Sequence, residues 1–280
     1  MNKKDSLGDR MKEFYENRSK LYLPRRVPVI IRLDGKAFHT FTKGFKRPYD
    51  EVFHNAMNET MKYLCENIQG CKLGYTQSDE ITLLLTDYDT ISTDAWFGYG
   101  MQKVCSVAAS MATLAFNKAF DYEVNVKSVC RGEYRIEYSD ALRKGAIFDA
   151  RCFSIPKDEV TNCFIWRQQD ATRNAIQMLG QYNFSHKELQ GKSCNDIQDM
   201  LMTQKNINFN DMPVEFKRGV CCYKVAREAT CINKKTQEET PCIRSEWFLD
   251  RNIPIFTQDR SYIDKFVFIN NEEINKSTSI

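Results

Sequence analysis

The sequence predicts an α+β fold built on a ferredoxin-like sheet with helices on one face. Four short runs rich in apolar and β-branched residues have the length of strands, and two longer stretches between them repeat apolar residues at helical spacing. Their order along the chain is strand, helix, hairpin, helix, strand, which is the split βαβ order of ferredoxin-like sheets. Further helices and C-terminal strands are expected after residue 156.

The first expected element is a helix over residues 5–20, because Leu7, Met11 and Phe14 fall on one side of it. A strand over residues 27–33 follows, with an apolar, β-branched centre. This strand is expected to lie inside the sheet.

A second helix is expected where apolar residues repeat at helical spacing over residues 53–68, and it should stop near Gly70. Residues 72–75 and 81–85 then form two strands. The polar segment 76–80 between them has the length of a hairpin turn, so it should form the tip of a hairpin.

The next expected helix covers residues 96–120 and presents small residues such as Ala108 to the core, and a strand over 146–153 completes the first half. The second half is expected to contain helices at 159–180, 185–189 and 193–205 and strands within 219–256 that are interrupted at 233–240.

Bulk composition limits the function classes. The 280 residues carry a net charge of only +3, so any nucleic-acid surface must be a local patch. The N-terminus has no apolar signal core and no stretch approaches the ~20 apolar residues of a membrane span, so a cytosolic protein without membrane contact is expected. Eleven cysteines without a CxxC pair predict reduced, mostly buried thiols.

Two short acidic motifs carry the predicted chemistry. Asp34 follows the first strand and Asp79 lies at the hairpin tip, where both can bind divalent cations together with the Gly35 carbonyl. Glu80 is a reserve carboxylate. A pair of Mg²⁺ ions held in this way serves phosphoryl and nucleotidyl transfer. The sequence therefore predicts a nucleotide-handling enzyme, although an ordinary Asp-Gly turn and a solvated hairpin tip remain the alternative.

We expect the nucleotide to bind beside the segment that follows Asp34, because the backbone amides of this segment and the Ser78 hydroxyl can bind phosphate oxygens. A basic cluster also lies just downstream of this segment. The residues expected to contact the nucleotide are Asp34, Gly35, Lys36, Ala37, Phe38, His39, Lys46, Ser78 and Asp79.

At these residues the chain resembles the tRNA-His guanylyltransferase superfamily, in particular its Thg1-like branch of 3′–5′ polymerases. The resemblance runs from about Asp5 to Phe256. The segments that carry it are Leu7–Lys12, Arg32–His39, Phe45–Pro48, Gln77–Glu80, Ser106–Ser110, Phe148–Arg151 and Trp166–Asp170.

The resemblance implies a catalytic domain over residues 1–155 that is similar to the palm of polymerases, with 156–280 as an extension of the same compact unit. It implies two Mg²⁺ ions on Asp34, the Gly35 carbonyl and Asp79, with Asp34, Asp79 and Glu80 as catalytic residues. The substrates would be tRNA and nucleoside triphosphates: ATP or GTP activates the 5′ end, and the 3′-hydroxyl of an incoming nucleotide attacks it. The family forms homotetramers.

One departure bears on the substrate. Family members that add one extra guanylate to tRNA-His carry a histidine where this chain has Thr172, whereas Asn174 is shared. This favours template-directed repair of 5′-truncated tRNA, with single guanylate addition as the alternative. A nucleotide cyclase and a non-catalytic tRNA-binding protein are remoter alternatives.

Basic and polar residues outside the acidic motifs are candidates for contacts with tRNA phosphates. They are Arg131, Arg135, Arg143, Lys144, Asn174, Lys217 and Arg218.

Overall fold

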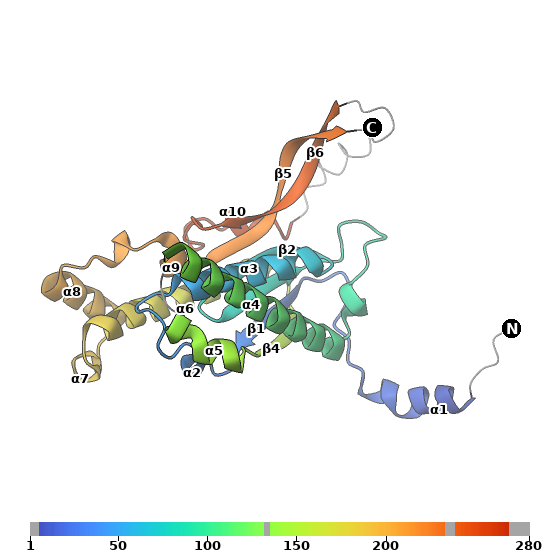
Figure 1. The fold of residues 1–280 in the computed structure, drawn as a ribbon. Coiled ribbons are helices and arrows are strands. Elements are labelled where there is room, and N and C mark those ends of the chain that lie inside the picture. Colours follow the sequence, from blue (N-terminus) through green and yellow to red (C-terminus); the bar gives the residue numbers. More distant parts are fainter. Residues whose placement is uncertain (1–5, 132–134, 233–238, 269–280) are drawn as a thin grey trace.

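The computed structural model describes residues 6–131, 135–232 and 239–268 and contains one six-stranded antiparallel sheet in the order β4-β1-β3-β2-β5-β6 (Figure 1). The first four strands and the two helices between them are β1 (Val29–Gly35), α3 (Glu51–Asn67), β2 (Cys71–Gln77), β3 (Glu80–Leu85), α4 (Met101–Arg131) and β4 (Phe148–Ser154). Because β3 lies between β1 and β2, and β1 lies between β3 and β4, this part is the ferredoxin-like split βαβ arrangement. The predicted fold class is confirmed.

The sheet has two apolar faces. Along β1, Val29, Ile31 and Leu33 belong to the large core that includes residues of α3 and α4. Ile30 faces the other way and belongs to a second core, because successive side chains of a strand point to opposite faces. The face under α3 and α4 is apolar to the end of β1, whereas the opposite face changes to Arg32 and Asp34.

The additional helix α6 (Lys157–Asn183) covers this second face, where Val160 and Phe164 pack against strand residues. The predicted helices on one face are therefore α3 and α4, and the extension supplies the cover of the other. Beyond α6, the short helices α7 (His186–Leu189), α8 (Cys194–Lys205) and η4 (Phe209–Asp211) gather around a third small core, whereas Val214 of the next helix, α9 (Val214–Arg218), packs against the second core.

The C-terminal strands β5 (Val220–Ile232) and β6 (Glu239–Asp250) widen the sheet, because residues 220–223 of β5 pair with β2. Their outer part continues as a two-stranded arm beyond the helices (Figure 1). Residues 251–256, which were expected to be part of a strand, are irregular. Most of the predicted interruption at 233–240 lies outside the described residues. The division of the chain at residue 155 into a catalytic domain and an extension stays a prediction.

The N-terminal helix is shorter than expected. The helix α1 (Ser6–Phe14) ends before a 3₁₀ turn, η1 (Glu16–Ser19), and it stands away from the rest of the molecule (Figure 1). Its apolar side, Leu7, Met11 and Phe14, is exposed. The short pieces that complete the described elements are α2 (Phe38–Phe41), η2 (Trp96–Tyr99), η3 (Arg135–Tyr138), α5 (Ser139–Lys144) and α10 (Ser261–Asp264).

Within the described residues, no helix has the length and apolar character needed to cross a membrane. Among the residues whose side chains are described, eight cysteines have free thiols, and most of these are buried as expected. Cys242 on the β5–β6 arm is disulfide-bonded, so the expectation of reduced thiols is wrong for this residue.

Gly219 allows the chain to turn from α9 into β5. Its φ is +85°, and a Cβ atom there would lie 2.5 Å from the backbone oxygen of Thr76. We expect Gly219→Ala to lower the free energy of unfolding by about 3 kcal/mol in urea titration, because both backbone strain and a backbone clash oppose it. Gly191→Ala is the control: its φ is +74° with nothing within 4 Å of the added atom, so only the strain of about 1 kcal/mol applies. Equal losses would contradict the clash.

Candidate active site

The register of the central strands gathers carboxylates at one end of the sheet. Asp34 at the end of β1 is directly opposite Glu80 of β3 on one side and Asp149 of β4 on the other. Directly opposed residues in antiparallel strands project to the same face. All three carboxylates therefore project to the face that α6 covers, beyond its apolar part.

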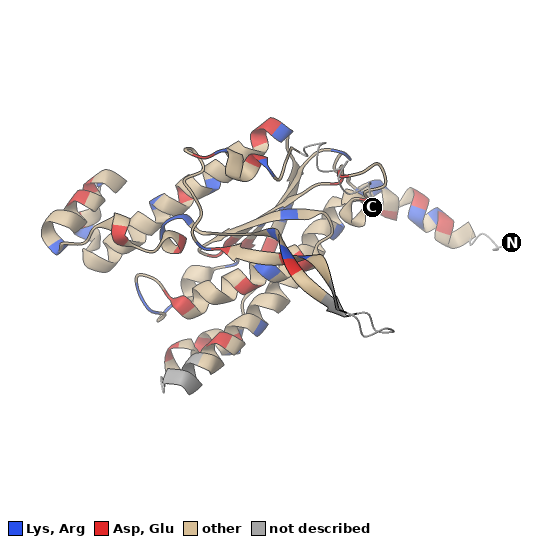
Figure 2. Ribbon diagram, turned by 90° about the horizontal axis from the view of Figure 1, so that it is seen from above, with Lys and Arg blue, Asp and Glu red and all other residues tan. Residues whose placement is uncertain are grey.

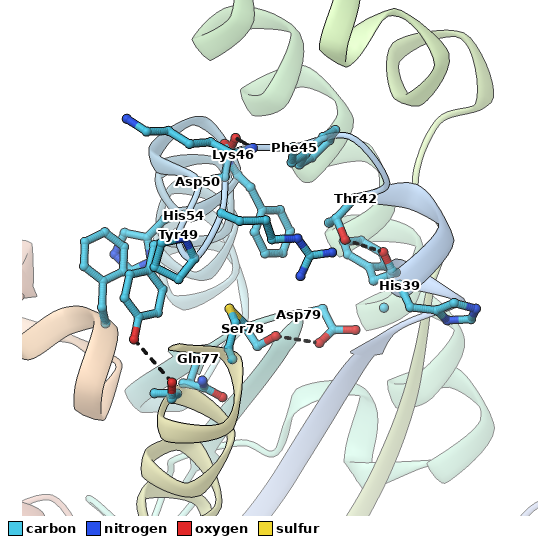
Figure 3. Close-up of a pocket in the computed structure, with 18 of the residues that line it drawn as sticks. His39, Thr42, Phe45, Lys46, Tyr49, Asp50, His54, Gln77, Ser78 and Asp79 are labelled. Atoms are coloured by element: carbon cyan, nitrogen blue, oxygen red, sulfur yellow. Dashed lines mark hydrogen bonds between the residues drawn. The ribbon is translucent and has the colours of Figure 1, made fainter. Parts of the chain in front are cut away.

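The turn between β2 and β3 brings the second aspartate to this place. The Gly35 N–H donates to the Asp79 carbonyl oxygen at 3.1 Å, which joins the turn to the end of β1. The Ser78 hydroxyl donates to the Asp79 carboxylate at 3.0 Å, and both side chains point into the adjoining pocket (Figure 3). The structure thus brings Asp34, Gly35 and Asp79 together as the sequence predicted.

Both aspartates lie close enough to other carboxylates for their charged forms to be disfavoured. Burial, followed by the negative charges of Glu80 and Asp149, raises the pKa of Asp34. Burial is also the main reason that the pKa of Asp79 is raised, and the charge of Asp34 adds to it. A cation between these carboxylates would remove the repulsion.

Glu80 differs from the two aspartates because arginines occupy both of its oxygens. Arg32 donates to them at 2.8 and 3.2 Å, and Arg167 of α6 donates at 2.9 and 3.1 Å. The Trp166 ring lies against both guanidinium groups, with its centroid 5.1 Å from the Arg32 Cζ and 3.6 Å from the Arg167 Cζ. In this arrangement Glu80 ties β1 and β3 to α6.

The carboxylates suit a metal that takes other ligands from its substrate. The described residues contain no group of three or more histidine, cysteine, aspartate or glutamate side chains placed to hold a metal ion. Mg²⁺ commonly binds through one or two carboxylates and completes its octahedron with water and substrate phosphates. Asp34, Asp79 and the Gly35 carbonyl fit such a shared site.

The segment after β1 presents backbone amides toward a ligand. The N–H groups of Gly35 and Lys36 already donate to Asp79 and Ile147 carbonyl oxygens. Within the described part of the chain, those of Ala37, Phe38 and His39 have no acceptor. Ala37 has a φ of +55° before the helical turn of α2, and successive amides in such a bend form an anion-binding concavity.

Aromatic packing holds this segment in place. The Phe38 ring contacts Phe116 and Phe148 at centroid distances of 5.5 and 5.2 Å. It also lies over Gly35, where a Cβ atom would be 2.2 Å from the ring. A glycine is therefore needed at position 35 for steric reasons, apart from any role of its carbonyl.

A cavity of about 440 Å³ opens between these amides and the β2–β3 turn (Figure 3). Of the predicted nucleotide contacts, Gly35, Ala37, Phe38, His39, Lys46, Ser78 and Asp79 line it, whereas Lys36 and Asp34 do not. The far wall carries residues that sequence reasoning missed: Thr42, Tyr49, His54, Glu215 and Phe216. Glu215 and Phe216 come from α9, and nothing in the sequence placed α9 beside α3.

The loop that forms the rim is fixed by Asp50. Its carboxylate accepts from the backbone N–H groups of Lys46 and Phe53 at 3.0 and 2.9 Å and from the Tyr138 hydroxyl at 3.0 Å. Asp50 is therefore the N-cap of α3.

A smaller cavity of about 150 Å³ lies beside the same turn and borders α6. Asp34, Glu80, Arg167, Asp170 and Asn174 line it, together with Gln77, Ser78, Asp79 and Ala171. Since Ser78 and Asp79 border both cavities, the turn separates them. This second cavity, which we call the acidic cleft, contains the predicted residue Asn174.

The other candidates for tRNA contacts are dispersed. Arg143 and Lys144 are exposed on α5, where Arg143 pairs with Asp140 at 3.0 Å. Lys217 and Arg218 line a third cavity. The side chains of Arg131 and Arg135 lie outside the described residues. In the view of Figure 2, basic and acidic residues are interspersed along the helices.

Comparison with known proteins supports the resemblance. Residues 8–156 match the family model described as tRNAHis guanylyltransferase (Thg1). A bacterial tRNA(His) guanylyltransferase (Thg1)-like protein, solved in complex with ATP, is 45% identical, with a TM-score of 0.77 over 94% of this chain and all of that chain. A second such structure, in complex with GTP, is 42% identical, with a TM-score of 0.74 over 95% of this chain and all of that one. A probable tRNA(His) guanylyltransferase from Dictyostelium discoideum is 24% identical over 76% of this chain and 81% of its own length.

The ion pairs of Glu215, on the far wall of this 440 Å³ cavity, should make the stability of the fold depend on pH. Glu215 accepts from His54 at 3.0 Å and from Arg251 at 2.6 Å, and these partners, His54 first, lower its pKa from 4.5 to about 2. A depressed carboxyl pKa stabilises the fold above the unfolded value, and this contribution is lost as pH falls through the folded value. We expect Glu215→Gln to cost about 2 kcal/mol in the free energy of unfolding at pH 6, with the difference shrinking between pH 4.5 and 2.

Urea titrations at several pH values measure this difference. Glu66→Gln, on an exposed position of α3, is the control and should show little loss at any pH. A loss for Glu215→Gln that stays constant from pH 6 to pH 2 would show that the carboxylate charge is not the cause.

Proposed function

The chain belongs to the tRNA-His guanylyltransferase family and is a nucleotidyltransferase, and we propose that it adds nucleotides in the 3′–5′ direction to the 5′ end of truncated tRNA, copying the opposite strand. ATP or GTP activates the 5′ end before addition. The observation that carries this proposal is the position of Asp79 between two cavities, one of which is also lined by Asp34.

Two cavities that meet at the Asp79 turn suit a displacement between two substrates. The larger cavity offers the free amides of Ala37, Phe38 and His39 for the phosphates of a nucleoside triphosphate. The relatives solved with ATP and with GTP support a triphosphate as this substrate. The acidic cleft is where the second reactant would bind, since it borders both Asp79 and Asp34.

Asp34, Asp79 and the Gly35 carbonyl would hold two Mg²⁺ ions, which supply charge neutralisation at phosphorus and a lower pKa for the attacking hydroxyl. The amides of residues 37–39 and the Ser78 hydroxyl orient the triphosphate. In activation, the 5′-phosphate oxygen bonds to the α-phosphorus of ATP and pyrophosphate leaves. In the nucleotide-addition step that follows, the 3′-hydroxyl of the incoming nucleotide bonds to the activated 5′ phosphorus and AMP leaves. Glu80 holds Arg32 and Arg167 beside the reacting groups.

The residue at position 172 supports repair over addition of a single guanylate. The Thr172 hydroxyl donates to the Lys217 carbonyl at 3.0 Å, so it joins α6 to α9. A threonine at this position cannot supply the imidazole that guanylate-adding members of the family carry there. Addition of the extra guanylate to tRNA-His remains the second candidate, because the matched family model and the Dictyostelium relative bear that name.

We also propose that the protein works in the cytosol, where it meets tRNA, and assembles as a homotetramer. The exposed apolar side of α1 supports self-association, since Leu7 and Phe14 are 58% and 52% exposed in the single chain.

The first test uses tRNA that lacks its first 5′ nucleotides, with ATP, Mg²⁺ and all four nucleoside triphosphates. We expect the wild type to extend the 5′ end and to halt when the acceptor stem is complete. Asp34→Asn and Asp79→Asn should each reduce the rate at least about 10³-fold while tRNA affinity changes little, because a carboxylate of the metal site is lost. Gel analysis of end-labelled tRNA measures extension.

Asp158→Asn is the matched control, because it makes the same change at an exposed position of α6. It should extend at the wild-type rate. Extension by both active-site variants would contradict the metal-site proposal, and no extension by the wild type would favour the cyclase or binding-protein alternatives.

A second test separates the two candidate reactions. We expect kcat/KM for filling a missing first nucleotide to exceed that for adding one guanylate to full-length tRNA-His by at least about tenfold, which is about 1.4 kcal/mol of transition-state stabilisation. Exchange of the tRNA-His anticodon should leave the repair rate unchanged. A preference for full-length tRNA-His that disappears with the exchanged anticodon would instead identify single guanylate addition as the activity.

A further inference from the structure

A third cavity, of about 510 Å³, lies along α6 apart from the two that border the aspartates. It is formed by α6, the segment from α8 to α9, and the chain after β6. Its lining residues are Gln168, Gln169, Thr172, Arg173, Ile176, Gln198, Phe209, Asn210, Lys217, Arg218, Ile255 and Thr257. None of these carries a carboxylate, whereas three are cationic, so we call it the basic cavity.

Lys217 is the unusual member of this lining. It is only 8% exposed, and a buried lysine is normally paired with a carboxylate. Within the described residues its ammonium makes one hydrogen bond, to the Asn210 carbonyl, and no ion pair. Burial lowers the pKa of Lys217, and the neighbouring Arg218 adds to this effect, with only Asp211 opposing it.

Arg218 makes the imbalance larger. Its guanidinium also has no carboxylate partner among the described residues, although its backbone carbonyl accepts from the Tyr75 hydroxyl at 2.7 Å. Arg173, the third cation, is paired with Asp170 at 2.7 Å. Two adjacent cations of the cavity, one of them buried, therefore have no anionic partner among the described residues. A bound anion would supply the compensating negative charge.

The chemistry of the lining selects among anions. A nucleoside triphosphate binds with Mg²⁺, which requires oxygen ligands of the kind that the aspartates offer at the other cavities. The basic cavity has no carboxylate for such an ion. Its amide and hydroxyl side chains, next to Ile176, Phe209 and Ile255, suit a phosphodiester with its sugar and base.

We propose that the basic cavity binds one backbone phosphate of the tRNA, with the adjoining unpaired nucleotide, through Lys217 and Arg218. This rests on the proposed function, since it takes tRNA as the substrate. The position of α6 supports it: Thr172 and Arg173 line the basic cavity, while Ala171 and Asn174 line the acidic cleft. An RNA strand held at one cavity thus lies along the helix that borders the reacting groups, and the cavity positions the substrate.

The test is tRNA binding as a function of salt, by filter binding or fluorescence anisotropy. The variant is Lys217→Met with Arg218→Gln, which removes both charges and keeps the length of the buried lysine stem. We expect about tenfold weaker binding at 0.15 M salt and a slope of log K against log salt reduced by about 1, since one phosphate contact is lost. Arg218→Gln alone, at a partly exposed position, should show a smaller change in the same direction and serves if the double variant does not fold.

The control variant is Lys187→Gln with Lys192→Gln, which removes two charges at exposed positions outside the three cavities. It should retain the wild-type salt slope. Equal slopes for wild type and the Lys217/Arg218 variant would overturn the proposal.

Equilibrium dialysis with ATP and no tRNA distinguishes a free nucleotide from RNA as the source of the phosphate. We expect the Lys217/Arg218 variant to bind as many equivalents of ATP as the wild type. Loss of one equivalent with unchanged tRNA affinity would overturn the proposal in favour of a nucleotide site. The binding slope needs no catalysis, so failure of the repair assay with a changed slope would reject the proposed reaction and retain the cavity.

Discussion

The ion pairs of Glu80 hold together the surfaces on which every cavity depends. Glu80 is part of β3, yet its two oxygens are bound by Arg32 of β1 and Arg167 of α6. Arg167 is only 7% exposed and also reaches Asp170 at 3.4 Å. Removing one partner of such a buried network leaves charges without compensation, which typically costs about 3–5 kcal/mol. Because residues of α6 line all three cavities, the shape of each depends on this contact with the sheet.

The arginines leave the acidic centre only partly neutralised. Glu80 has its own cations, while Asp34 and Asp79 have none among the ion pairs of the described residues. The raised pKa values of both aspartates have burial as their largest cause. A fold that keeps such groups near each other without a cation carries an electrostatic cost, and a divalent ion shared with a substrate would offset it. This difference separates Glu80, which organises the protein, from the two aspartates, which face the cavities.

The sequence was informative where the pattern is local. Four strands, their helices and the meeting of Asp34 with Asp79 follow from apolar spacing and from turn residues near Gly35 and Ser78. The far wall of the cavity that faces the amides of residues 37–39 could not be predicted in this way, because Glu215 meets His54 across 161 positions of the chain and no periodicity indicates such a contact. Glu80 was expected beside the metal ligands; its two arginine partners come from distant segments, and only the folded chain shows them.

The position of the site is determined by the hydrophobic pattern of β1 more than by the site residues themselves. Val29, Ile31 and Leu33 are fully buried against the core that contains α3 and α4, and this fixes which residues of the strand face α6. A shift of one residue in register would exchange the two faces and bury Asp34 in that apolar core. Burial of an unpaired carboxylate there would cost several kcal/mol, so the alternation of apolar residues specifies the register strongly. The same alternation that stabilises the sheet therefore delivers Asp34 to the face where Asp79 and the cavities lie.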